Sequence, residues 1–139
     1  MKYRIAVFDD EVTELQKTEE MIQRYAKEHT EHELEISRFT ELEPFTEAVC
    51  DGLKDWKCAF HILYIDINPP EGAEMESARC LRKQGFEDII IFISPTSEHA
   101  LEAYEVEARH YLVKPVSQKA INKAMNRAIE KLSHITFMY

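Results

Sequence analysis

The sequence predicts an α/β fold, a doubly wound five-stranded parallel sheet with helices on both faces. Five segments of strand length alternate along the chain with segments whose apolar residues recur at helical spacing. Two of the strand-like segments are apolar almost throughout, which is typical of central strands that are covered on both faces. Because strands that alternate with helices pair in parallel, we expect all five strands to end at the same edge of the sheet.

The first three strands differ in the depth of burial that their patterns predict. Residues 3–8 are rich in β-branched and aromatic types, which favour a short buried strand, and a helix over 11–29 follows. Residues 34–39 alternate apolar and polar side chains, which predicts a half-buried edge strand before a helix over 41–53. The third strand, 59–66, is almost wholly apolar and is therefore expected at the centre of the sheet.

The second half of the chain continues the alternation. Residues 73–84 form a predicted helix that ends at Gly85, a residue type that commonly follows a last helical turn. In the segments that follow, each strand is rich in β-forming residues, and each helix starts near a serine that can cap it. These remaining elements are a strand over 89–94, a helix over about 97–107, a strand over 110–113 and a helix over 117–132.

Composition and charge restrict the possible functions. The chain has 139 residues, with 45% hydrophobic and 31% charged side chains, which fits one globular domain. Its net charge of −9 argues against direct nucleic-acid binding, because phosphate contacts need a basic surface. We expect a cytoplasmic domain over residues 1–132, without a signal segment or a membrane span. Residues 133–139 are interpreted as a tail or as the start of a linker to an effector domain.

Polar side chains gather at the predicted ends of the strands. Asp9 and Asp10 follow the first strand, Asp66 ends the third, Ser94 ends the fourth, and Lys114 follows the fifth. Ligands of open parallel sheets bind at this edge, near the switch in strand order. Three carboxylates that meet there repel one another, so one of them takes a proton or all of them share a cation. As a simpler alternative, Asp9 or Asp10 only caps the helix that follows.

Mg²⁺ is the cation that suits this set of oxygens. It is usually held by one or two carboxylates together with waters and a phosphate. We expect Asp10 and Asp66 to bind it directly and Asp9 to bind it through water or to support the other ligands. The backbone carbonyl of Asn68 could complete the set. A carboxylate can also attack phosphorus as a nucleophile, and the phosphoryl oxygens then need donors and positive charge around them.

Taken together, these residues resemble the receiver domain of bacterial two-component response regulators. The resemblance covers residues 3–132 and rests on the order and spacing of several short motifs. The stretches 97–104 and 111–115 are most similar to the LytR/AlgR branch, in which a LytTR-type DNA-binding domain usually follows. The motifs are Asp9-Asp10-Glu11, Asp66 with Pro70 four residues on, Ser94, Tyr111 and Lys114-Pro115.

The resemblance implies a fold, a reaction and partners. The sheet would be flavodoxin-like, with the strand order 2-1-3-4-5. Asp66 would accept a phosphoryl group from a sensor histidine kinase in the presence of Mg²⁺, while Ser94 and Lys114 bind the phosphoryl oxygens. Ser94 and Tyr111 would form the conformational switch, and the Lys114-Pro115 bond would be cis. The domain would not be a turnover enzyme. A homodimer could form through the fourth helix, fifth strand and fifth helix. Transcription would be controlled through a separate DNA-binding domain.

Departures from the family pattern leave alternatives open. Pro95 replaces a usually small residue and lacks the amide that commonly helps to bind the phosphoryl group. Glu74 stands where the family usually has glycine, so we expect the loop over 69–76 to be rebuilt. Both departures favour a pseudo-receiver, a binding module of this fold that is not phosphorylated. A third possibility is an aspartate-dependent phosphatase, although such enzymes usually carry a second Asp where Asn68 stands. Tyr111 could also be an ordinary packed strand residue.

Overall fold

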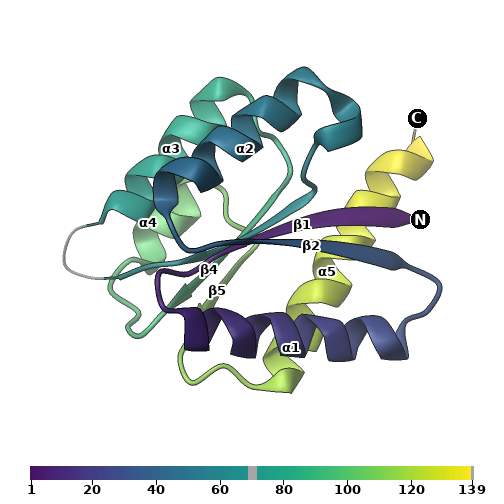
Figure 1. The fold of residues 1–139 in the computed structure, drawn as a ribbon, viewed down its shortest axis with the longest axis horizontal. Helices are drawn as coiled ribbons and strands as arrows, with labels where there is room; N and C mark the ends of the chain where they lie inside the picture. The colour runs from purple at the N-terminus through teal and green to yellow at the C-terminus, as the bar shows by residue number, and fades with distance from the viewer. Residues whose placement is uncertain (69–71, 139) are drawn as a thin grey trace.

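The computed structural model describes residues 1–68 and 72–138, with the side chains of the last helix described as far as Ser133. Within these ranges, strands and helices alternate as predicted (Figure 1). The strands are β1 (Lys2–Phe8), β2 (Glu33–Phe39), β3 (Ile62–Asp66), β4 (Ile89–Ser94) and β5 (His110–Val113). The helices are α1 (Val12–Glu28), α2 (Leu42–Lys54), the 3₁₀ helix η1 (Trp56–Cys58), α3 (Ala73–Gln84), α4 (Ala100–Glu105) and α5 (Gln118–Met138).

The strands form one parallel sheet in the order β2-β1-β3-β4-β5. This is the order that the resemblance implied, and the predicted fold class is confirmed. In the register of the sheet, Phe8 of β1 lies beside Ile65 of β3, and Asp66 lies beside Ile93 of β4. The carboxyl ends of these strands therefore lie at one edge of the sheet.

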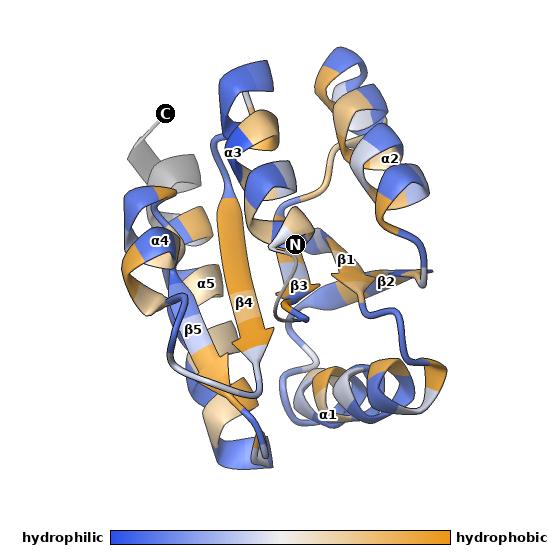
Figure 2. Ribbon diagram, turned by 90° about the vertical axis from the view of Figure 1, so that its left-hand side faces the viewer, coloured by the Kyte–Doolittle hydropathy of each residue, from blue (hydrophilic) through white to orange (hydrophobic). Residues whose placement is uncertain are grey.

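The hydrophobic core has two parts, one on each face of the sheet. Figure 1 shows α1 and α5 on one side and α2, α3 and α4 on the other. Along β3, Ile62 and Tyr64 pack on the α1 and α5 side, whereas Leu63 and Ile65 pack on the opposite side. Figure 2 shows β4 as an almost continuous hydrophobic strand. Burial on both faces explains why these two strands are apolar at nearly every position.

The third strand begins later than the apolar pattern predicts, at Ile62 and not at residue 59. The residues before it form η1, whose start is capped by Asp55. The carboxylate of Asp55 accepts a hydrogen bond from the amide of Lys57 at 3.0 Å. Such local bonds compete with a sheet ladder, and Ala59 accordingly lies before the strand and outside it.

The fourth helix is shorter than expected. It spans Ala100–Glu105, whereas a helix over about 97–107 was predicted. No side chain caps its start. Glu107, one residue past the C-cap, has a left-handed backbone conformation (φ 58°), which an L-residue adopts only at a cost and which a helix cannot continue through.

The fifth helix is longer than expected. It runs to Met138, whereas an end near residue 132 was predicted. Neither glycine nor proline follows Leu132 to stop the helix, and the Ser133 hydroxyl lies 3.0 Å from the hydroxyl of Tyr3 on β1. Residues 133–138 are thus helical, and their assignment as a tail or linker stays a prediction. Within the described ranges, no helix has both the length and the apolar character that crossing a membrane requires.

Candidate functional site

Three carboxylates meet at the carboxyl edge of the sheet. Asp9 and Asp10 directly follow β1, and Asp66 is the last residue of β3. Each offers an oxygen that lies within 4.8 Å of the other two. Asp66 and Asp9 are buried, with exposed fractions of 2% and 3%, whereas Asp10 is exposed. Because β1 and β3 are neighbours in the sheet, Asp66 forms a cluster with Asp9 and Asp10, although they are far from it in sequence.

Burial makes the charged forms of two of these acids costly. It raises the pKa of Asp9 to about 7, and the nearby charge of Asp66 adds to this effect. The amide of Glu11 donates to Asp9 Oδ1 at 3.0 Å and opposes the rise. Burial also raises the pKa of Asp66. Carboxylate oxygens gathered in this way are the donors that Mg²⁺ prefers, and a bound cation would relieve their repulsion.

Lys114 supplies the positive charge nearest to Asp66. It follows β5, and its Nζ lies 2.8 Å from Asp66 Oδ1. Burial lowers the pKa of Lys114, but the hydrogen bond to Asp66 and its charge outweigh burial, so the net shift is upward. For Asp66 the balance is opposite, because burial outweighs the attraction of the ammonium. The Lys114-Pro115 peptide is cis, as the resemblance implied.

Ser94 and Tyr111 both hold Thr96, in the segment between β4 and α4. Ser94 ends β4 and is fully buried, and its Oγ accepts a hydrogen bond from the amide of Thr96 at 3.2 Å. The hydroxyl of Tyr111 donates to the carbonyl of Thr96 at 2.6 Å. Pro95 lies between Ser94 and Thr96 and has no amide hydrogen to offer. The structure therefore links the two predicted switch residues through one neighbouring residue.

Asn68 lies beside the acidic cluster and is held at two points. Its side-chain amide donates to Asp10 Oδ1 at 2.8 Å, and its backbone amide donates to Glu74 Oε1 at 3.3 Å. Glu74 is in the first turn of α3 and is only 8% exposed. Comparison with the family pattern identified Glu74 as a replacement for the usual glycine, but the sequence did not predict its contact with Asn68. Of the loop predicted to be rebuilt, residues 69–71 lie outside the described residues.

Solved structures similar to this chain include receiver domains. The BeF3-activated DrrB receiver domain of Thermotoga maritima aligns with a TM-score of 0.67 at 25% identity, covering 94% of this chain and 99% of that one. A response regulator receiver domain from Clostridium thermocellum gives a TM-score of 0.76 at 20% identity, covering 96% and 98%. The chain has the fold of response-regulator receiver domains and resembles them along nearly its whole length. The homologous response regulators are signalling proteins.

Curated proteins similar to this chain include regulators of the LytT and LytR type. Sensory transduction protein LytT of Bacillus subtilis is 26% identical over 124 residues, which is 89% of this chain and 47% of LytT. LytT of Oceanobacillus iheyensis is 36% identical over 76 residues, covering 52% of this chain and 30% of the relative. These relatives support the LytTR branch, and the chain spans less than half of their length. No protein-family model matches the chain.

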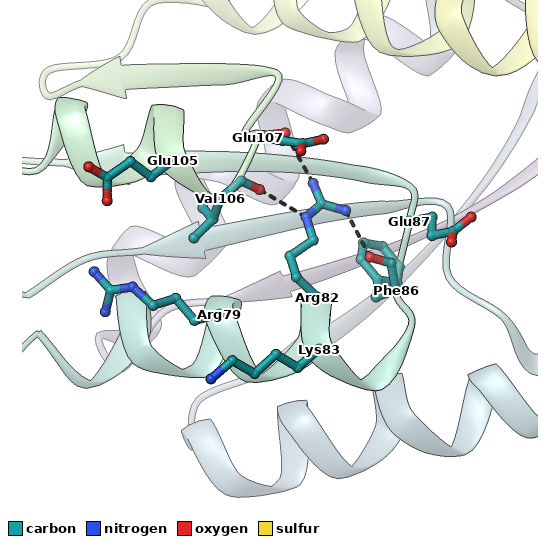
Figure 3. A pocket seen from close by; sticks show the side chains of 8 residues that line it. All are labelled: Arg79, Arg82, Lys83, Phe86, Glu87, Glu105, Val106 and Glu107. Atoms are coloured by element: carbon teal, nitrogen blue, oxygen red, sulfur yellow. Dashed lines mark hydrogen bonds between the residues drawn. The ribbon is translucent and has the colours of Figure 1, made fainter.

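The chain also has a pocket of about 550 Å³ between α3 and α4, which none of the acidic-site residues lines (Figure 3). Arg82 of α3 lies in this pocket, and its guanidinium donates to backbone carbonyls on both sides. The acceptors are Val106 at 2.9 Å, Phe86 at 2.9 Å, Asp88 at 2.8 Å and Glu107 at 3.1 Å. Arg82 therefore joins the end of α4 to the segment before β4. The sequence gave no sign of this role, because the acceptors are backbone carbonyls that no residue type marks.

Proposed function

We propose that this receiver domain is phosphorylated on Asp66 by a sensor histidine kinase. The observation that carries the proposal is the placement of Asp66, which is buried beside Asp9 and Asp10 and lies 2.8 Å from Lys114. A buried carboxylate beside two further carboxylates and an ammonium has the surroundings that a phosphoacceptor needs. The carboxylates can hold a cation, and the ammonium can hold an anionic phosphoryl group.

The acidic cluster would hold Mg²⁺ through Asp9, Asp10, Asp66 and the backbone carbonyl of Asn68. The ion, when bound, supplies positive charge to the phosphoryl oxygens. In the transfer itself, an oxygen of Asp66 forms a bond to phosphorus while the bond between phosphorus and the donor imidazole nitrogen breaks. The imidazole nitrogen keeps that electron pair. Asp66 becomes an acyl phosphate, which water hydrolyses slowly.

Two side chains are placed to bind the transferred group. The ammonium of Lys114 already lies against Asp66 and would move its hydrogen bond from the carboxylate to a phosphoryl oxygen. The Ser94 hydroxyl would turn toward a second oxygen. The Thr96 amide donates to Ser94 Oγ, and the Tyr111 hydroxyl donates to the Thr96 carbonyl. Rotation of the Ser94 hydroxyl would therefore displace Thr96 and change the position of the Tyr111 side chain.

The surface that responds to the switch would be that of α4, β5 and α5. Leu101 and Tyr104 of α4 and Val113 of β5 are large apolar side chains with exposed fractions of 71%, 80% and 46%. We assign this face to a homodimer that forms on phosphorylation. Transcription would be controlled through a DNA-binding domain outside this chain, and the protein would work in the cytoplasm beside its kinase.

Beryllofluoride binding tests the phosphoacceptor proposal, because beryllofluoride mimics an acyl phosphate on a carboxylate. With Mg²⁺ present, we expect NMR shifts at Asp66, Ser94 and Tyr111 that saturate with added beryllofluoride. The Asp66→Asn variant should show none of them. Absence of shifts in the unaltered chain at saturating Mg²⁺ would refute the proposal.

A pseudo-receiver is the second candidate, and one observation favours it. Pro95 cannot donate to a phosphoryl oxygen, and the next amide, that of Thr96, already donates to Ser94 Oγ. A binding module with an inactive site would take neither Mg²⁺ nor beryllofluoride. Titration with Mg²⁺ alone separates the two candidates, because only the phosphoacceptor needs the cation.

A further inference from the structure

Glu74 is a buried acid that the proposed phosphotransfer leaves without a role. It lies in the first turn of α3, is 8% exposed, and accepts the backbone amide of Asn68 at 3.3 Å. Burial raises the pKa of Glu74, and the charges of Asp10 and Asp66 add to the rise. A carboxylate kept in such surroundings needs a compensating interaction, and the hydrogen bond to Asn68 provides one.

Within the described residues, Glu74 is not among the acids whose oxygens gather within 4.8 Å, which are Asp9, Asp10 and Asp66. Its contact is instead with Asn68, whose backbone carbonyl is the neutral ligand of the proposed cation site. The side chain of Asn68 is fixed by Asp10, and its backbone amide is fixed by Glu74. These two anchors restrict where the carbonyl of Asn68 can lie.

The start of α3 makes this contact possible. Its N-cap is Gly72, which has a left-handed backbone (φ 66°) and no side chain to cap the helix. Glu74 and Glu76 are both acidic residues of the first turn, but only Glu74 is buried. Glu76 is exposed and pairs with Arg79 of the same helix at 3.1 Å. The two glutamates therefore form a matched pair, one turned toward the site and one turned away.

We propose that Glu74 is a positioning residue that orients the Asn68 carbonyl toward Mg²⁺ through the hydrogen bond to the Asn68 amide. The inference rests on the proposed function, because it assigns the bond a role at the cation site. This role requires the hydrogen-bond acceptor of Glu74 and not its negative charge. Glutamine at position 74 should therefore preserve Mg²⁺ binding, whereas a side chain without an acceptor oxygen should weaken it.

The test is a Mg²⁺ titration of the chain, followed by NMR or calorimetry, with four variants. Glu74→Gln keeps the acceptor and removes the charge, whereas Glu74→Ala and the longer Glu74→Met remove both. Glu76→Ala is the control. We expect Mg²⁺ affinity about tenfold weaker in Glu74→Ala and Glu74→Met, and within about twofold of the unaltered chain in the other two. Without Mg²⁺, hydrogen exchange of the Asn68 amide should be faster in the Ala and Met variants only.

Three results would overturn the inference. Equal weakening in Glu74→Gln and Glu74→Ala would mean that charge, and not the bond, affects the cation. Unchanged Mg²⁺ affinity in both Glu74→Ala and Glu74→Met would mean that the bond has no role at the site. Failure of the unaltered chain to bind Mg²⁺ would remove the proposed function as well as this inference. In the first two results, the proposed function stands.

Discussion

The ammonium of Lys114 lies 2.8 Å from Oδ1 of Asp66, although the two residues lie at the ends of strands that are not neighbours. Asp66 ends β3, Lys114 follows β5, and β4 lies between these strands. The long lysine side chain reaches across the end of β4 to the buried carboxylate. The other two acids of the cluster, Asp9 and Asp10, follow β1. The site thus depends on the order of four strands.

Lys114→Met should remove the positive charge beside Asp66. Beryllofluoride affinity at saturating Mg²⁺ should fall at least about tenfold, because a charge-assisted bond to the anion is lost. Mg²⁺ affinity should stay the same or increase, since a competing cation has gone. Lys119→Met, an exposed position on α5, is the control and should change neither value. A Lys114→Met variant with normal beryllofluoride affinity would contradict the assigned role.

Mg²⁺ affinity should increase as pH rises toward 7. Burial raises the pKa of Asp9 to about 7, so below this value a proton competes with the cation. Calorimetric titration across this range measures the effect. In Asp9→Asn, affinity should be weaker and its dependence on pH smaller. The idea fails if the unaltered chain binds Mg²⁺ equally well on both sides of this pKa.

Without metal, the same group should make stability depend on pH. The folded-state pKa of Asp9, about 7, lies above its ordinary value of 3.8, so the folded state binds more protons between the two. This contribution is fully present below the unfolded pKa and is lost as pH rises through about 7. Urea denaturation in EDTA should give an unfolding free energy that falls less steeply with pH in Asp9→Asn. An identical slope would show that Asp9 is not so shifted.

Pro95→Ala should strengthen the hold on the phosphoryl group. The substitution restores a backbone amide next to Ser94, and a charge-assisted hydrogen bond contributes about 1.5–3 kcal/mol. Beryllofluoride should therefore bind at least about tenfold more tightly than to the unaltered chain. Mg²⁺ affinity measured in parallel should not change. Equal beryllofluoride affinity would mean that the amide at this position does not face the anion.

Arg82→Met should destabilise the fold without affecting the acidic site. Four backbone carbonyls lose their donor, those of Val106, Phe86 and Glu107 (Figure 3) and that of Asp88, and we expect the unfolding free energy to fall by about 2–4 kcal/mol. Arg79→Met is the matched control on the same helix. Its ion pairs with Glu76 and Glu102 are partly exposed, so its cost should be below about 1 kcal/mol. Similar costs by urea denaturation would contradict the role of Arg82.

Alternation of strands and helices made most of the fold predictable, and the apolar sequences of β3 and β4 identified the centre of the sheet. Element ends were harder to predict. The bond from the Lys57 amide to Asp55 caps η1, and β3 begins only after it. The left-handed backbone at Glu107 ends α4. The last helix continues past Leu132, where neither glycine nor proline stops it. In each case a local backbone preference, and not the hydrophobic pattern, sets the boundary.

The site was predictable to the extent that parallel strands end at one edge, which placed Asp9, Asp10 and Asp66 together. The strand order came from the family resemblance, and the topology agrees with it. The contacts of Glu74 and Arg82 were not predictable, because both side chains bind backbone groups. Any residue supplies an amide or a carbonyl, so the sequence carries no mark of such partners.

Phosphorylation at Asp66 is the central claim, and intact mass spectrometry after incubation with acetyl phosphate and Mg²⁺ tests it most directly. We expect the mass of one added phosphoryl group, located on Asp66 by peptide mapping and absent when EDTA replaces Mg²⁺ or when Asp66 is changed to Asn. An unmodified mass under saturating acetyl phosphate and Mg²⁺, or a phosphoryl group that persists in Asp66→Asn, would contradict the claim.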